Sequence, residues 1–338
     1  MKQTLVILSM TLALFAGKTL GGGGETPPLK LVQTFKLPVD VKGNFDHFAI
    51  DLTGNRLFAT PEAYKAVLVF DLKTGELIHK ITGIEKPHAI LYREDLQRLY
   101  VTDGEAGDVK IVDSVSYKLL SSVKLLEDSD SIGYDPITKY LYVDNGGGDV
   151  HQTYSMLSVV DTTAGKKVAD IKIDGDTLEA MVLDKSSSRI FLNNKDKNRV
   201  DVIDREKRTL ITSWAVTLAK TNVAMAYDEA NHRLFIACRS GGIVVLDSQT
   251  GKEITVLPIT KGVDDLVFDP ARKRLYASCD GDASVYERSS ADSYKLLGKV
   301  PTGTLARTAL LVPQLNRYFV AVPQHGNSSA EIQVFEVQ

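Results

Sequence analysis

Four carboxylates share the same local position in this chain of 338 residues. Each lies ten residues before a short apolar segment that opens with arginine or tyrosine, and the four are Asp46, Asp130, Glu179 and Asp264. Oxygen ligands of this kind suit a hard cation such as Ca²⁺ or Mg²⁺. The spacing therefore predicts a metal site, provided that the fold brings the four positions together.

Histidines stand beside this carboxylate position. With one extra residue allowed in the second repeat, Pro87 takes the carboxylate position and His88 the next one, which His47 and Asp265 occupy in two other repeats. Imidazole nitrogen would also admit Zn²⁺ or Mn²⁺. Beside a cation that polarises a carbonyl group, His88 or His47 could serve as a catalytic base.

Three more residues extend the candidate site. Arg307 takes the carboxylate position in the last repeat, and its guanidinium suits an anionic substrate group. Asn222 precedes that position by one residue in the fifth repeat, and His325 lies in a loop expected on the same face. The candidate ligand-binding residues are therefore Asp46, His47, His88, Asp130, Glu179, Asn222, Asp264, Asp265, Arg307 and His325.

A second interpretation gives these side chains no ligand. Short polar residues are common where a strand begins, because unpaired backbone groups need partners and aspartate favours turns. The carboxylates would then be solvated, and the protein would be a scaffold without a small-molecule site.

The elements that must position these residues form a seven-fold repeat. Each unit holds four short runs rich in Val, Ile, Leu, Tyr and Phe, separated by turns rich in Gly, Asp, Asn and Pro. The first residue of the second run, here called the repeat marker, is Arg56, Arg98, Tyr140, Arg189, Arg233, Arg274 or Arg317. The intervals of 41 to 49 residues predict an all-β, seven-bladed β-propeller with four antiparallel strands per blade.

The two ends of the chain suggest how the ring closes. The last unit stops after its third run, EIQVFEV (331–337), while an unattached run, LKLVQTFKLP (29–38), precedes the first unit. We expect the N-terminal run to complete the last blade, which removes an open sheet edge.

The first residues have the pattern of an export signal. Lys2 is followed by a short apolar stretch, which predicts a signal peptide over residues 1–21 with an approximate cut. Residues 22–28 then form a flexible leader, and residues 29–338 form a single propeller domain. Export predicts a periplasmic or extracellular protein, and no later segment is long and apolar enough to span a bilayer.

Charge and cysteine content narrow the partners. The net charge is −3, which gives no general attraction to nucleic acid. The arginine markers could form a basic ring, but no aromatic residues alternate with them to stack bases, so we interpret them as turn caps and expect no nucleic-acid partner. Cys238 and Cys279 fall at equivalent places in adjacent blades, which favours two free thiols over a disulfide. We expect a monomer.

Several segments resemble a known family. LYVTD (99–103), LYVDN (141–145) and VVLDSQTGKEITVLPI (244–259) are similar to the YVTN-repeat β-propellers, a mostly exported bacterial group, and the resemblance covers residues 29–338. Similar propellers include periplasmic binding proteins and phosphogluconolactonase-like enzymes.

These observations lead to three hypotheses of function. The main one is a non-enzymatic binding module that holds a small molecule or a protein at the mouth of the central channel, with Ca, Mg, Mn or Zn as the candidate cofactor. The second is a cation-dependent, lactonase-like hydrolase or lyase that uses the same site. The third is the scaffold without a small-molecule site.

Overall fold

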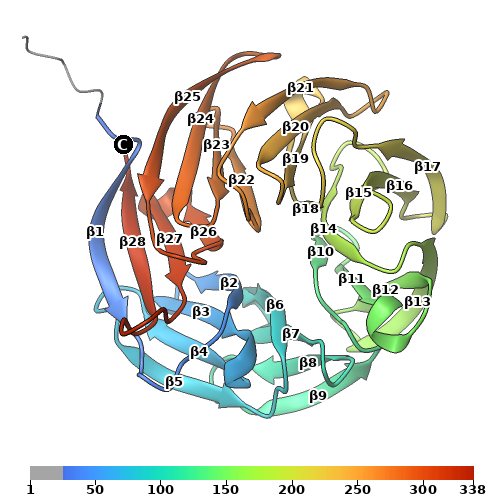
Figure 1. Cartoon of the computed structure of the whole chain (residues 1–338). Helices are drawn as coiled ribbons and strands as arrows, with labels where there is room; N and C mark the ends of the chain where they lie inside the picture. The colour runs from blue at the N-terminus through green and yellow to red at the C-terminus, as the bar shows by residue number, and fades with distance from the viewer. Residues whose placement is uncertain (1–25) are drawn as a thin grey trace, which may run out of the picture.

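Seven four-stranded sheets form a closed ring in the computed structural model, which describes residues 26–338 (Figure 1). Each sheet is one blade, and its strands pair antiparallel in order from the channel to the rim. The protein is therefore an all-β, seven-bladed β-propeller, as the repeat predicts.

The strands of the seven blades take four positions. The inner strands are β2 (Phe45–Asp51), β6 (Pro87–Arg93), β10 (Ile132–Asp135), β14 (Leu178–Leu183), β18 (Asn222–Asp228), β22 (Asp265–Asp269) and β26 (Thr308–Val312). The second strands are β3 (Arg56–Pro61), β7 (Arg98–Asp103), β11 (Tyr140–Gly146), β15 (Arg189–Asn194), β19 (Arg233–Cys238), β23 (Arg274–Ser278) and β27 (Arg317–Val322).

The remaining strands build the rim of the ring. The third strands are β4 (Ala66–Asp71), β8 (Asp108–Asp113), β12 (Tyr154–Asp161), β16 (Arg199–Asp204), β20 (Gly242–Asp247), β24 (Asp282–Ser290) and β28 (Glu331–Val337). The outer strands are β5 (Leu77–Thr82), β9 (Leu119–Lys124), β13 (Lys166–Asp174), β17 (Thr209–Ala215), β21 (Glu253–Pro258), β25 (Ser293–Pro301) and β1 (Leu29–Lys36). Short 3₁₀ turns are η1 (Glu62–Tyr64), η2 (Glu94–Leu96), η3 (Gly147–Val150), η4 (Glu229–Asn231) and η5 (Pro313–Leu315).

The N-terminal strand closes the ring. β1 pairs antiparallel with β28, so the last blade has the order β1-β28-β27-β26 (Figure 1). Phe35 of β1 is 1% exposed and packs against Phe70 of the first blade and Phe319 of the last. The predicted closure is confirmed. The predicted signal peptide lies outside the described residues, as does most of the predicted leader, and both remain predictions.

Packing between blades explains the continuous apolar runs of the second and third strands. Both faces of these strands are covered by neighbouring blades, so consecutive residues such as Leu57, Phe58 and Ala59 are all buried. The outer strands have one face in solvent and are more polar, as in Leu119–Lys124, where Val123 alone is buried. Whether the apolar residues of a strand are continuous thus depends on whether the strand buries both of its faces or only one.

The acid that ends most third strands closes a turn. The carboxylate of Asp71 accepts the N–H groups of Lys73 and Thr74, at 2.9 and 2.8 Å. The same two-bond pattern occurs at Asp113, Asp161, Asp204 and Asp247. Each aspartate caps its turn by accepting hydrogen bonds from the backbone N–H groups two and three residues further on, which explains why the residue recurs.

Five of the six arginine markers form ion pairs with carboxylates of the protein. Arg56 contacts Asp51 at 2.6 Å, and Arg189 contacts Asp184 at 2.7 Å. Arg233, Arg274 and Arg317 also have carboxylate partners. These contacts support the interpretation of the arginines as turn caps.

Two further expectations concern the cysteines and membrane-spanning segments. Cys238 and Cys279 are buried free thiols, and burial raises the pKa of each to about 12. No helix within residues 26–338 has the length and hydropathy to cross a membrane.

Removing the Phe35 side chain should weaken the whole ring. Phe35→Ala is expected to lower the free energy of unfolding by about 3–5 kcal/mol, because it empties a packed site between the first and last blades. Val32→Ala on the same strand is a control, since Val32 is 44% exposed and should cost about 0.5 kcal/mol or less. Urea unfolding measures both, and equal losses would contradict closure through Phe35.

Candidate functional site at the mouth of the channel

A β-bulge at the start of the inner strands shapes the mouth of the channel. In the first blade Phe45 pairs with Pro61 and Phe48 with Ala59, so two residues between them face a single residue of β3. The same shift occurs in the blades that begin with β6, β14 and β18. A bulge of this kind re-aims side chains, so consecutive residues can both turn toward one site.

Polar residues opposite the bulges hold them in place. Thr60 accepts the N–H of His47 at 2.8 Å and donates to its carbonyl oxygen at 3.0 Å. Thr102 accepts the N–H of Ala89 at 2.8 Å and donates to the carbonyl of Asp130 in the next blade at 2.9 Å. These hydroxyls satisfy backbone groups that the bulge leaves unpaired, and that of Thr102 also ties its blade to the next.

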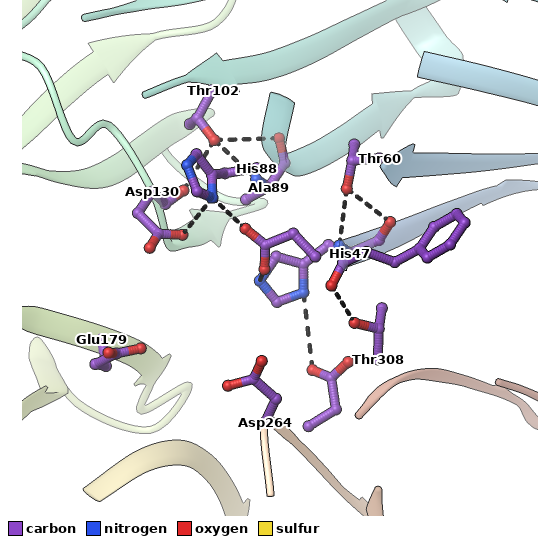
Figure 2. A network of polar contacts seen from close by, with 12 residues as sticks. His47, Thr60, His88, Ala89, Thr102, Asp130, Glu179, Asp264 and Thr308 are labelled. Atoms are coloured by element: carbon purple, nitrogen blue, oxygen red, sulfur yellow. Dashed lines mark hydrogen bonds and ion pairs between the residues drawn. The ribbon is translucent and has the colours of Figure 1, made fainter. Parts of the chain in front are cut away.

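Asp46, His88 and Asp130 come together from three consecutive blades. Nδ1 of His88 donates a hydrogen bond to Oδ2 of Asp46 and lies 3.6 Å from Oδ1 of Asp130. One donor atom from each residue lies within 4.8 Å of the other two. Figure 2 shows Asp130 beside the imidazole of His88, with Glu179 and Asp264 set apart from this cluster.

His47 joins the cluster from the side. Its Nε2 lies 3.4 Å from Oδ1 of Asp46, and its Nδ1 lies 3.7 Å from Oδ1 of Asp265. Asp265 also accepts the N–H of Ala309 at 2.8 Å, so it is fixed between the first and last blades. Asp265 thus supports His47.

Burial and mutual charge set the protonation of these groups. Burial alone would lower the pKa of His47 and of His88, but the surrounding carboxylates raise both to about 9. Burial would raise the pKa of Asp46, yet the two imidazolium groups hold it at about 2. Burial, followed by the charge of Asp46, raises the pKa of Asp130 to about 8. At neutral pH both histidines are therefore charged, Asp46 is ionised and Asp130 holds a proton.

Two ion pairs occupy the other side of the mouth. Lys195 pairs with Glu179, and Nη2 of Arg239 lies 2.5 Å from Oδ1 of Asp264. The four predicted metal-ligand carboxylates therefore divide into two groups. Asp46 and Asp130 meet at His88, while Glu179 and Asp264 are neutralised by cationic partners.

The mouth is a polar pocket of about 210 Å³. Side chains from the first six blades line it, and these include six of the ten candidate residues: Asp46, His47, His88, Asp130, Glu179 and Asp264. The sequence alignment of the second repeat needs a correction. Pro87 pairs with Asp103 as Phe45 pairs with Pro61, so no extra residue is present and His88 itself takes the carboxylate position.

Three candidate residues lie away from this pocket. Asn222 precedes the bulge, so its side chain turns between blades, where it donates to Asn193 at 2.9 Å. Arg307 turns to Asp280, at 3.4 Å. His325 lines a separate cavity of about 520 Å³ at the last blade.

Three ionisable lining residues are not among the sequence candidates. Glu62, Lys195 and Arg239 each lie six residues after a repeat marker, in the connection between second and third strands. Glycine takes the same position in the second blade, where a Cβ on Gly104 would lie 2.7 Å from Nε2 of His88. The shared offset from the marker is the one sequence signal that relates these residues, since the residue types at this position differ.

Asp144 is a buried acid beside the mouth. It stands four residues after its marker, as Thr60 and Thr102 do, and it is 2% exposed. Neither of its carboxylate oxygens has a hydrogen-bond partner within residues 26–338. Burial, followed by the charge of Asp130, raises its pKa well above the ordinary value.

Fold and site together define a seven-bladed β-propeller with a polar pocket at the mouth of its channel. No family model matches the chain. Over 120 residues the chain is 29% identical to the "Uncharacterized protein YncE" of Salmonella typhi and 28% identical to the protein of that name in Salmonella typhimurium. The match covers 35% of this chain and 34% of each relative, so the chain spans about a third of the length of these curated relatives.

Solved structures share the fold over most of the chain. A chain of the Kuenenia stuttgartiensis hydrazine synthase has a TM-score of 0.74 at 18% identity, covering 89% of this chain and 98% of that one. A chain from the crystal structure of a mitotic checkpoint complex has a TM-score of 0.73 at 14% identity, with 99% of both chains covered. At these identities the likeness concerns the fold alone.

Metal-free protein should lose stability as the pH rises. The folded-state pKa of His88 is about 9, against 6.5 for the ordinary group, so its stabilisation is complete below pH 6.5 and is lost as the pH passes through about 9. A shift of this size corresponds to a loss on the order of 3 kcal/mol. Urea unfolding below pH 6.5 and above pH 9 measures the loss.

Two variants separate His88 from the rest of the chain. His88→Gln should show a smaller loss over this window than the wild type. His232→Asn should lose as much as the wild type, because His232 is exposed in a left-handed position that asparagine tolerates. A wild-type unfolding free energy that stays constant over the window would overturn the protonation assigned to the mouth.

Proposed function

We propose that the protein is an exported binding module of the YVTN-repeat type that holds a divalent cation and a small ligand at the mouth of the channel. The observation that carries the proposal is the cluster of Asp46, His88 and Asp130, whose donor atoms lie within 4.8 Å of one another at the pocket. The repeated segments support the family, and the N-terminal pattern supports export.

The chemistry of the donor set favours a borderline metal. Two carboxylates and one imidazole suit Zn²⁺ or Mn²⁺ better than Ca²⁺, which prefers six to eight oxygen ligands. Three protein ligands leave coordination positions open toward the pocket, where an exogenous ligand can bind. His88 and Asp130 hold protons in the metal-free protein, so metal binding should release protons at neutral pH.

A binding role is better supported than catalysis. In the metal-free protein both histidines have pKa values of about 9, so they are already protonated at neutral pH and cannot accept a further proton as a base. The hydrolase remains a second candidate, because His47 lines the pocket next to Asp46. A panel of lactones and esters tests it on metal-loaded protein, and turnover that His47→Gln abolishes would favour the hydrolase.

Loss of a ligand side chain should abolish metal binding. Calorimetric titration with Zn²⁺ and Mn²⁺, with Ca²⁺ and Mg²⁺ for comparison, should show one site in the wild type. His88→Gln and Asp130→Asn are expected to weaken binding by more than about 100-fold, the upper end of the range for a residue that only supports a ligand. His232→Asn is the control and should bind as the wild type does. If none of the four ions binds to the wild type, the metal proposal is overturned.

Displacing His88 without changing a ligand should also weaken binding. Gly104→Ala places a Cβ 2.7 Å from Cδ2 and Nε2 of His88, so the imidazole must move. We expect metal affinity to fall by about 10- to 100-fold. Gly148→Ala is the matched control, because its Cβ would meet no atom closer than 3.8 Å. Equal affinities of the two variants would show that the position of His88 does not matter.

A further inference from the structure

We propose that the ligand of the mouth is a small organic carboxylate whose apolar group, about the size of a benzene ring, enters an apolar neck directly below. For its head group this inference rests on the proposed cation site. The neck is a cavity of about 160 Å³ walled by Phe48, Ile90, Ile132 and Met181.

The neck opens from the mouth. His47, Ser131 and Ala180 line both cavities, so the polar pocket and the apolar neck are adjacent. The four wall residues each stand eight residues before a repeat marker, two positions after the residue that faces the mouth. The bulge thus sets the polar layer, and the next channel-facing layer is apolar.

The size of the neck limits what it can hold. An apolar cavity of about 150 Å³ in a protein core stays dry and takes up benzene. The neck has this size, and although His47 and Ser131 also line it, its four wall residues offer apolar surface that an apolar group can bury. The mouth alone, at about 210 Å³, is smaller than most small-molecule sites, whereas mouth and neck together reach the lower end of the usual range of about 300 to 1,000 Å³.

The mouth selects the head group. A cation held by three protein donors keeps positions open for an anionic ligand. Arg239 lines the same pocket, and its buried Nε has no hydrogen-bond partner within residues 26–338. A carboxylate can bind the cation and accept a hydrogen bond from the guanidinium, which binds such groups well.

A chain-length series tests the neck. Acetate, butanoate, hexanoate and phenylacetate would be titrated into Mn²⁺-loaded protein by calorimetry. Affinity should rise by about fourfold for each methylene that enters the neck. Phenylacetate should bind more tightly than acetate by a factor similar to the total gain over the series from acetate to hexanoate. Equal affinity for all four carboxylates would overturn the proposed neck.

Filling the neck should remove this gain. Ile90→Phe and Ile132→Phe enlarge side chains from two different blades, so hexanoate should bind no better than acetate in either. Both should keep the wild-type affinity for Mn²⁺, because neither residue lines the mouth. Ile137→Phe is the control for added volume, because Ile137 lies in the same blade and is 78% exposed. A full chain-length gain in both neck variants would overturn the proposal.

The two proposals fail in different ways. Mn²⁺ binding without a chain-length gain leaves the cation site standing and refutes the neck. If no cation binds, the proposed cation site fails, and the same series on metal-free protein, with Arg239 as anion partner, still decides whether the neck takes up apolar groups.

Discussion

The mouth depends on the bulge at the start of the inner strands. Side chains of a regular strand alternate between faces, so two consecutive residues cannot reach the same site. Extra residues opposite Thr60 and Thr102 break this alternation and turn Asp46 and His88 toward the channel. The hydroxyl of Thr102 also bonds to the next blade, so one side chain both secures a bulge of the site and joins two neighbouring blades.

The charges of the mouth balance only because they are close together. Asp46 stays ionised because two imidazolium groups face it, and these stay protonated because carboxylates surround them. The ion pairs of Lys195 and Arg239 neutralise the other side. A divalent cation between Asp46, His88 and Asp130 would take the place of the protons that His88 and Asp130 hold. Positive charge would be exchanged for positive charge, so no additional charge would have to be buried.

The fold could be predicted well from the sequence because the residues that recur in the repeat are those that the packing of every blade requires. Arginine markers, capping aspartates and apolar runs each report a local requirement that every blade shares. The central cluster was predicted only in part. The structure brings together Asp46, His47, His88 and Asp130, as expected. Asn222 turns away, because the direction of its side chain depends on the bulge, which cannot be recognised in the sequence. Lys195 and Arg239 were missed because their position holds different residue types in different blades, so no single chemistry marks it.

Ring closure by β1 has a consequence for the order of folding. β1 is synthesised long before β28, the strand with which it pairs, since Leu29 lies opposite Val337 and Lys36 opposite Glu331. Until β28 and the rest of the last blade have been made, β1 has no strand to pair with, and the side of Phe35 that packs against Phe319 lies open to wrong partners. The contact with the greatest sequence separation must therefore form late.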